Sequence, residues 1–221
     1  MKRIVILAIL LGSFGETQAQ KAQLESEVSL SAGSDEFALS LGGLRTHRLF
    51  KSEKWLLGYG LRYNLFAASN VDYITAPARL TLNDKLDTFN MAAPQLHMLN
   101  AYVMLGYQFH PRWSFEFDID LLGLSFGGQK AGLFNSSEFP AFNGTHSANP
   151  TPLNVLLVGD NDLGSLSSNF RLHYRLNDSW GVRAGFNYFF TEYTTTMLLS
   201  EQNDRFRRKS GMFSLAVNRR F

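Results

Sequence analysis

The sequence predicts an all-β fold, an eight-stranded antiparallel transmembrane β-barrel, from three observations. Apolar and polar residues alternate along eight segments, which is the period of a half-buried strand. The connections between these segments are alternately short and long, an asymmetry typical of membrane barrels. The N-terminus has the pattern of an export signal, so the mature chain is expected to leave the cytoplasm.

The export signal occupies residues 1–19. Lys2 and Arg3 form a positive n-region, residues 4–11 form the apolar h-region, and Thr17-Gln18-Ala19 is a small-residue cleavage site. An apolar run of about eight residues is too short for a membrane helix, which needs roughly 20. We therefore expect cleavage after Ala19 and a barrel domain over residues 20–221.

Composition excludes several classes of function. A length of 221 residues suits one domain, and a net charge of +2 is too small to indicate nucleic-acid binding. The chain has no cysteine, so disulfides, thiolate chemistry and cysteine zinc sites are excluded, and no cofactor is expected. No later segment has 18 consecutive apolar residues, so membrane insertion would require a barrel.

The eight predicted strands follow the apolar residues of period two. In the third strand Trp55, Leu57 and Tyr59 alternate with Leu56, Gly58 and Gly60. Several segments have about 10 residues, the length of a tilted strand that crosses a bilayer. The predicted strands cover residues 24–32, 37–41, 55–66, 99–109, 113–121, 166–176, 180–190 and 213–221.

The lengths of the connections predict which end of the barrel carries the long loops. Residues 51–54, 110–112 and 177–179 form short turns. Residues 68–96 and 127–163 form long extracellular loops, and residues 199–209 form a loop of medium length. Connections longer than about 12–15 residues are usually functional or disordered, and 127–163 is too apolar for a disordered segment.

The two strand faces differ in chemistry. Trp55, Trp113 and Trp180 each open a strand after a short turn and point outward by parity, which predicts one interfacial aromatic girdle. A soluble sandwich with three tryptophan anchors shares the same alternation and stays open as an alternative. In a barrel the opposite, polar face lines the interior: Arg62, Glu116, Asp118, Asp120, Arg171, His173, Arg175 and Arg183.

Two predicted neighbouring strands carry opposite charges on this polar face. Glu116, Asp118 and Asp120 lie on one, and the second carries Arg171, His173 and Arg175. Unpaired charges inside a narrow barrel would cost several kcal/mol each, so we expect the two sets to pair across the strands. The cluster is then a salt-bridge plug, because eight strands enclose little more than their own side chains. A proton relay or a gated polar channel is the alternative.

The export signal, the eight strands, the repeated turn followed by tryptophan and the last strand resemble the small outer-membrane barrels of the OmpA, OmpX and OmpW type. In that family an amphipathic last strand with an aromatic terminus is read by the barrel assembly machinery, and Phe213, Leu215, Val217 and Phe221 fit this signal. Arg219 departs from the pattern. The resemblance implies a Gram-negative outer membrane with lipid and lipopolysaccharide around the barrel.

The resemblance implies architecture more than activity, because family members include adhesins, structural proteins, narrow channels and lipid-modifying enzymes. We expect a structural or surface-binding protein whose loops bind an unidentified extracellular ligand. A narrow channel for small or apolar solutes is the second hypothesis, and a lipid-modifying enzyme is the third. No catalytic set is evident: His146 and Ser147 are adjacent in a long loop, which fixes no geometry.

Overall fold

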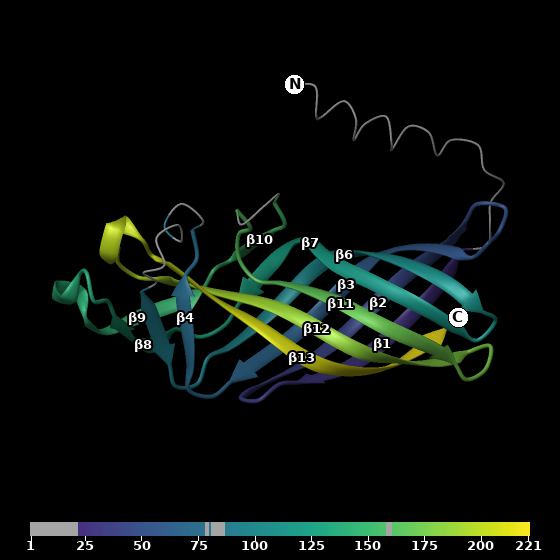
Figure 1. The fold of residues 1–221 in the computed structure, drawn as a ribbon, viewed down its shortest axis with the longest axis horizontal. Coiled ribbons are helices and arrows are strands. Elements are labelled where there is room, and N and C mark those ends of the chain that lie inside the picture. Colours follow the sequence, from purple (N-terminus) through teal and green to yellow (C-terminus); the bar gives the residue numbers. More distant parts are fainter. Residues whose placement is uncertain (1–21, 78–79, 81–86, 158–160) are drawn as a thin grey trace, which may run out of the picture.

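The computed structural model describes residues 22–77, 80, 87–157 and 161–221. These residues form one antiparallel sheet of thirteen strands that closes in a ring (Figure 1). The strands are β1 (Gln23–Ala32), β2 (Glu36–Leu49), β3 (Trp55–Ala68), β4 (Val71–Thr75), β5 (Thr88–Met91), β6 (Gln95–His110), β7 (Trp113–Phe126), β8 (Lys130–Asn135), β9 (Gly144–Pro150), β10 (Leu153–Val155), β11 (Leu166–Arg175), β12 (Trp180–Thr195) and β13 (Arg205–Arg220).

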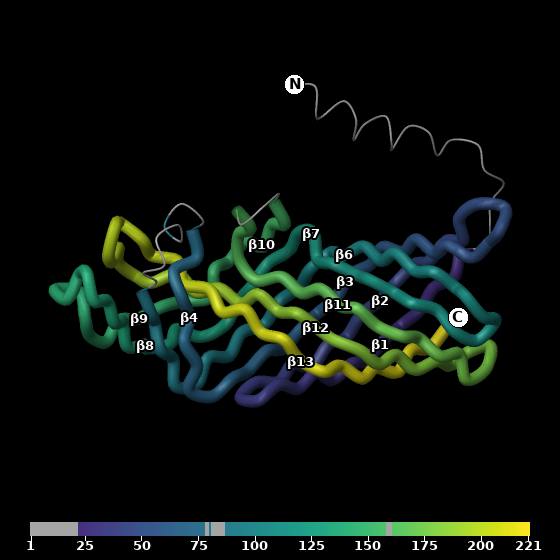
Figure 2. The backbone as a smooth tube through the Cα atoms, in the orientation of Figure 1, coloured from purple at the N-terminus to yellow at the C-terminus, as the bar shows by residue number. Residues whose placement is uncertain are grey.

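The ring closes through its long strands. The pairings run β1–β2–β3–β6–β7–β11–β12–β13 and return to β1, where Glu25 lies opposite Arg220 and Ala32 opposite Phe213. The backbone trace shows these strands winding obliquely around a common axis (Figure 2). Closure leaves no exposed edge along the long strands, which removes a template for aggregation.

The prediction of eight strands is wrong as a count, because the sheet has thirteen. The five additional strands, β4, β5, β8, β9 and β10, are short and fall inside the two segments predicted as loops, residues 68–96 and 127–163. Four of them pair in the order β13–β4–β5–β8–β9–β12, so they continue the sheet beyond one end of the ring, whereas β10 pairs with β7. Part of the predicted 199–209 loop is also strand, since β13 begins at Arg205.

Most predicted strands are present but longer, for identifiable reasons. The second was expected to stop at residue 41, yet β2 continues with Leu44 buried and Arg45 exposed, which reverses the apolar pattern. The fifth was expected to stop at residue 121. There β7 contains a bulge that places Leu121 and Leu122 on the same exposed face, and the strand continues to Phe126 with its alternation shifted.

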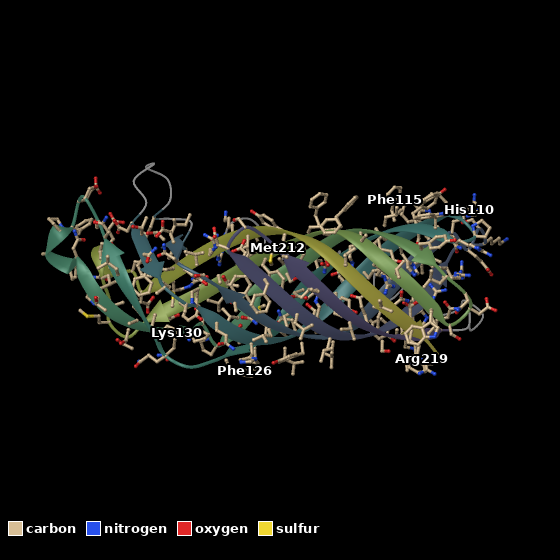
Figure 3. All side chains as sticks on the ribbon, turned by 90° about the horizontal axis from the view of Figure 1, so that it is seen from below. His110, Phe115, Phe126, Lys130, Met212 and Arg219 are labelled. Atoms are coloured by element: carbon tan, nitrogen blue, oxygen red, sulfur yellow. The ribbon has the colours of Figure 1, made fainter. Side chains whose placement is uncertain are left out.

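The outside of the ring is apolar. Large hydrophobic residues are exposed on every long strand, for example Leu61 at 60%, Phe170 at 60% and Leu215 at 55%. In the view with all side chains, Phe115 and Phe126 project outward from the ribbon (Figure 3). Over the described part of the chain, no helix has the length and hydropathy to cross a membrane.

The interior of the ring is filled by layers of different chemistry. Towards the short turns lies a polar layer with many buried charged residues. Towards the long connections lies an apolar cluster to which ring strands and added short strands both contribute. This cluster, the apolar plug, consists of Ala38, Phe66, Val71, Tyr73, Phe89, Met91, Leu96, Met98, Phe134, Ala148, Phe189, Tyr193, Leu199, Phe206 and Met212.

The predicted export signal, residues 1–19, lies outside the described residues. Cleavage after Ala19 therefore stays a prediction. The first described strand, β1, begins at Gln23, four residues after the predicted cleavage position.

Candidate functional site

The buried charges of the ring interior form one connected ion-pair layer. Its members come from six strands, so they meet only because the ring closes. The carboxylates are Glu25, Glu27, Glu116, Asp118 and Asp120, and the basic groups are Arg62, Arg171, His173, Arg183 and Arg220. Five carboxylates thus face four guanidiniums and one imidazole, which nearly balances the buried charge.

Arg183 on β12 is the centre of the layer. Its guanidinium contacts Glu25 at 2.7 Å, Glu27 at 2.7 Å and Glu116 at 2.6 Å, each through a different nitrogen. The Arg183 side chain is only 2% exposed. Glu25 is further held by Arg220 at 2.9 Å and by the Asn218 amide at 3.0 Å. One guanidinium therefore ties β12 to β1 and β7 across the ring.

A second group of ion pairs within the layer joins β3, β7 and β11. Arg62 donates to Asp118 at 2.6 Å and to Asp120 at 2.5 Å, and Arg171 donates to Asp118 at 2.9 Å. Arg171 also contacts Glu27 at 2.6 Å, which connects this group to the ion pairs of Arg183. Each of these carboxylates has further polar partners, so their desolvation is compensated.

The structure brings together seven of the eight interior residues that the sequence indicates. Arg175 is the exception, because it is only partly buried and makes no ion pair within the described residues. The pairing also differs in detail: Asp120 binds Arg62 of β3 instead of a basic residue of β11. The reason is the register, in which Arg171 lies opposite Glu116 and its long side chain reaches past it to Asp118.

Three members of the layer, Glu25, Glu27 and Arg220, were not among the predicted interior residues. Glu25 and Glu27 alternate with apolar residues at the start of β1, so parity already placed them on the polar face. The partners of Glu25 and Glu27 in the layer lie 144 to 195 positions away, for example Arg183 for Glu25. Only closure of the ring between β1 and β13 makes such pairs predictable.

Ser114, His173 and Glu116 form a compact buried group that superficially has the composition of a hydrolytic triad. Ser114 Oγ lies 3.3 Å and a Glu116 carboxylate oxygen 2.9 Å from the same imidazole atom, His173 Nδ1. A serine relay needs the hydroxyl and the carboxylate on different ring nitrogens. All three residues are at most 4% exposed, so a substrate cannot reach the hydroxyl. We assign the group to the ion-pair layer.

A polar staple fixes the segment after β9 to the ring. Pairing of β7 with β11 ends at Ile119, and β10 pairs with β7 beyond it. The fully buried Asn154 side chain donates to Asn100 at 2.8 Å and accepts from Ser125 Oγ at 2.9 Å and from the Ser165 amide at 2.8 Å. This staple closes the seam where β7 and β11 diverge.

A second ion-pair cluster lies near the long connections. Glu192 accepts from Arg205 at 2.8 Å and from Arg207 at 2.7 Å, and both arginines also donate to the carbonyl of Asp162. Glu36 accepts from Arg208 at 2.8 Å and from Ser210 at 2.7 Å. On β4 nearby, the phenol of Tyr73 is fully buried, which raises its pKa and keeps it neutral. The arginine contacts join β13 to β12, to β2 and to the segment at Asp162, and the Tyr73 hydroxyl lies 3.1 Å from Thr191 Oγ1 of β12.

The three tryptophans lie at the short-turn end. Trp55 packs on Tyr107 with ring centroids 5.0 Å apart, and Trp113 packs on Tyr174 at 4.5 Å. Trp180 lies under the guanidinium of Arg219, which also contacts the ring of Phe221. Along β13, Phe213, Leu215, Val217 and the terminal Phe221 are all exposed on the outer face. Arg219 thus rests on aromatic rings at the edge of the apolar surface.

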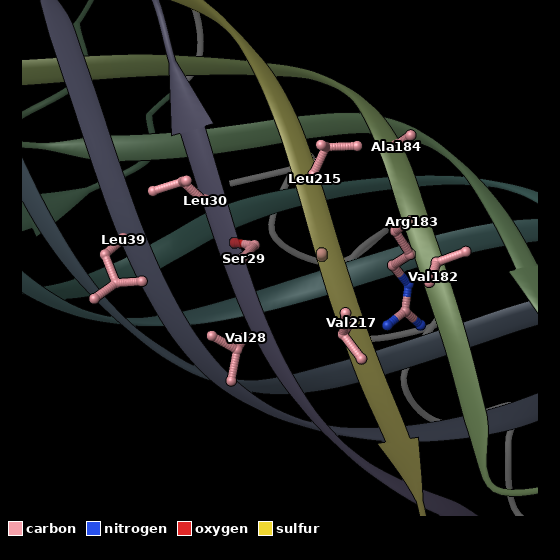
Figure 4. Close-up of a pocket in the computed structure, with 10 residues that line it drawn as sticks. Val28, Ser29, Leu30, Leu39, Val182, Arg183, Ala184, Leu215 and Val217 are labelled. Carbon is pink, nitrogen blue, oxygen red and sulfur yellow. The ribbon is translucent and has the colours of Figure 1, made fainter.

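The outer surface has a shallow apolar depression of about 430 Å³ across β1, β2, β12 and β13. Figure 4 shows Val28, Leu39, Leu215 and Val217 around it. Val182 and Ala184 contribute from β12, whereas Arg183 between them carries the guanidinium that enters the ion-pair layer. Adjacent residues of one strand therefore serve an apolar exterior and a charged interior.

Comparison with known proteins gives structural similarity only. No family model matches the chain. No curated protein matches its sequence. Similar solved structures include Neisserial surface protein A (TM-score 0.39, 11% identity, 90% of this chain and 96% of that one) and the Yersinia pestis outer membrane protein Ail (0.40, 10%, 91% and 100%). A de novo designed transmembrane β-barrel is also similar (0.38, 9%, 93% and 100%).

Ail is an outer membrane protein and the designed protein a transmembrane β-barrel, but sequence identities of 9–11% and TM-scores of 0.38–0.40 assign neither property to this chain. In the described residues, no group of three or more His, Asp or Glu side chains is placed to hold a metal ion.

Proposed function

We propose that this protein is an outer-membrane barrel whose eight long strands span the bilayer and whose role is structural or surface-binding. The short strands and connections at the far end would carry the binding. The observation that carries this proposal is the combination of an apolar exterior with an interior filled by ion pairs and the apolar plug.

The exterior supports insertion into a bilayer. From Trp55 to Leu65 the outward face of β3 covers ten residue steps. At roughly 3.3 Å per residue and a tilt of about 40°, this corresponds to a band of about 25 Å, the height of the apolar band of outer-membrane barrels. In water so many exposed Leu, Phe and Val residues would form a patch far larger than soluble monomers tolerate.

The interior supports a closed barrel more than a channel. A hydrated path would have to pass both the ion pairs around Arg183 and the apolar plug. The side chains of Phe66, Phe89 and Phe206 in the plug are fully buried. Opening it would expose guanidiniums that now have carboxylate partners. We therefore place the channel hypothesis second.

The short strands β4, β5, β8 and β9, which continue the sheet beyond the ring, form an extension of the ring. This extension supports a surface-binding role because it is folded. The β8 and β9 strands pair over five residues, and Phe134 of β8 packs into the apolar plug beside Phe206. The polar staple and Glu192 hold the neighbouring segment. A folded platform keeps its side chains positioned, so binding need not order a flexible loop.

The location is tested by cell fractionation. We expect the chain in the outer-membrane fraction, with a band whose electrophoretic mobility changes on boiling, because a closed hydrogen-bonded barrel resists detergent unfolding. A soluble periplasmic protein would overturn the membrane proposal and favour the sandwich alternative.

The binding role is tested by removing the outer part of the extension. We expect that replacing residues 130–148 by a short Gly-Ser linker abolishes binding of the purified protein in nanodiscs to ligands that the full chain captures on glycan and protein arrays. The matched control, Leu133→Ser with Lys130→Gln, changes one exposed and one partly exposed side chain of the same hairpin without removing it. Unchanged binding after the deletion, with heat-modifiable mobility intact, would exclude the hairpin as the binding element.

Conductance measurements distinguish the channel hypothesis from the structural or surface-binding role. We expect the native barrel in planar bilayers to show no current steps above those of protein-free membranes, because the ion-pair layer and the plug fill the interior. Reproducible steps that disappear in an Arg62→Gln barrel that still folds would make the channel the leading function.

A further inference from the structure

A pocket of about 510 Å³ lies at the short-turn end of the ring, opposite to the extension. It is formed between the β2–β3 turn, the β6–β7 turn and the end of β11. His110, one of its lining residues, is visible at this end of the molecule (Figure 3). The pocket belongs neither to the ion-pair layer nor to the proposed binding surface.

Among the ionisable residues that line this pocket, basic ones predominate. Arg48, Lys54 and Arg175 line it together with His110, and Glu53 is the one carboxylate among the lining residues. Arg175 differs from the deeper arginines of the ring, because among the described residues it has no carboxylate partner and its Nε is buried without a hydrogen bond. A guanidinium with unused donors beside two other cations is suited to an anionic ligand.

The pocket is held in shape before any ligand arrives. One Arg48 nitrogen donates to the Gln108 side chain at 2.7 Å and to the carbonyl of Glu53 at 2.7 Å. The Gln108 amide in turn donates to the carbonyl of Pro111 at 2.9 Å. Arg48 and Gln108 thereby connect the two turns, so the basic groups lie in fixed positions and lose little entropy on binding.

We propose that this pocket binds a phosphate group. The guanidiniums of Arg48 and Arg175 offer planar donor pairs that match phosphate oxygens, and Lys54 adds a point charge. Phe109, another lining residue, is 46% exposed on the apolar outer face, so the pocket lies beside the surface that would meet lipid. The phosphate can therefore belong to a phospholipid headgroup or to free phosphate.

The proposal is tested by calorimetry on the full refolded protein in octyl glucoside and phosphate-free buffer. The probes are inorganic phosphate and dihexanoyl phosphatidylglycerol, with dihexanoylglycerol as a ligand without phosphate. We expect saturable binding of at least one phosphate probe and none of dihexanoylglycerol. Tighter binding of the phospholipid assigns a headgroup site, and equal or tighter binding of inorganic phosphate assigns free phosphate.

The variant Arg175→Gln should weaken the binding roughly 10- to 100-fold, because it removes charge-assisted hydrogen bonds. Because Arg175 has no ion-pair partner in the part of the chain that the structure describes, the variant should still fold, with native heat-modifiable mobility. The matched control, Lys51→Gln, removes a charge from the same β2–β3 turn at a residue outside the pocket lining and should change the affinity less than about twofold. Absence of binding by either probe, or equal losses in the two variants, would overturn the proposal. So would unchanged affinity in Arg175→Gln.

Discussion

Replacing Arg183 by methionine is expected to destabilise the protein by about 3–5 kcal/mol, the largest effect of any single substitution proposed for this chain. Methionine fills a similar volume but leaves three carboxylates, Glu25, Glu27 and Glu116, without the guanidinium that contacts each of them at 2.6–2.7 Å. Glu116 is 2% exposed, so water cannot replace the lost partner. The change in the free energy of unfolding is measured by urea titration of the protein folded in lipid vesicles.

Arg175→Met is the matched control for this substitution. It also removes a guanidinium from the inner face, but one without a carboxylate partner, so we expect a change below about 1 kcal/mol. A triple variant that adds Glu25→Gln and Glu116→Gln to Arg183→Met should recover part of the lost stability, because it removes the stranded charges. Equal effects of Arg183→Met and Arg175→Met would show that the ion-pair layer does not hold the ring together.

The sequence predicts the long strands of this fold well and the short ones poorly. Alternation of apolar and polar residues needs only one apolar environment outside and one polar environment inside, and β11 meets that condition, as do the parts of β3 and β12 that lie outside the apolar plug. The pattern fails where the interior itself becomes apolar, as at Met98 and Phe66. There both faces of a strand are hydrophobic, and period two carries no signal.

The ion-pair layer is likewise predictable from the sequence only in part. Parity assigns Asp118 and Arg171 to the interior, but it gives no partner, because a partner depends on the register and on which strands meet across the ring. The contact between Arg171 and Glu27 joins residues 144 positions apart and exists only after closure. Arg175 illustrates the converse. Its parity is right, yet it lies beyond the ion-pair layer, and no carboxylate of the described residues forms an ion pair with it.

Introducing arginine at Phe117 is expected to destabilise the folded protein by about 2–4 kcal/mol in a lipid bilayer. Phe117 is 41% exposed on the outer face of β7, between Leu105 of β6 and Phe170 of β11, which are 46% and 60% exposed. If the long strands span the membrane, this position lies far from both ends of the apolar band, where a guanidinium must be buried in hydrocarbon. The measurement is urea unfolding in vesicles, with native protein alongside.

Phe109→Arg supplies the matched control, because it makes the same exchange on the same outer face near the short-turn end. There the arginine can reach the headgroups, and the cost should fall to about 0–1 kcal/mol. The depth dependence is the decisive quantity. If the outer face met water, both substitutions would place a charge in solvent and shift stability by at most about 0.5 kcal/mol. Small and equal effects would therefore refute insertion, whereas a large cost at Phe117 beside a small one at Phe109 is expected only when lipid surrounds the ring.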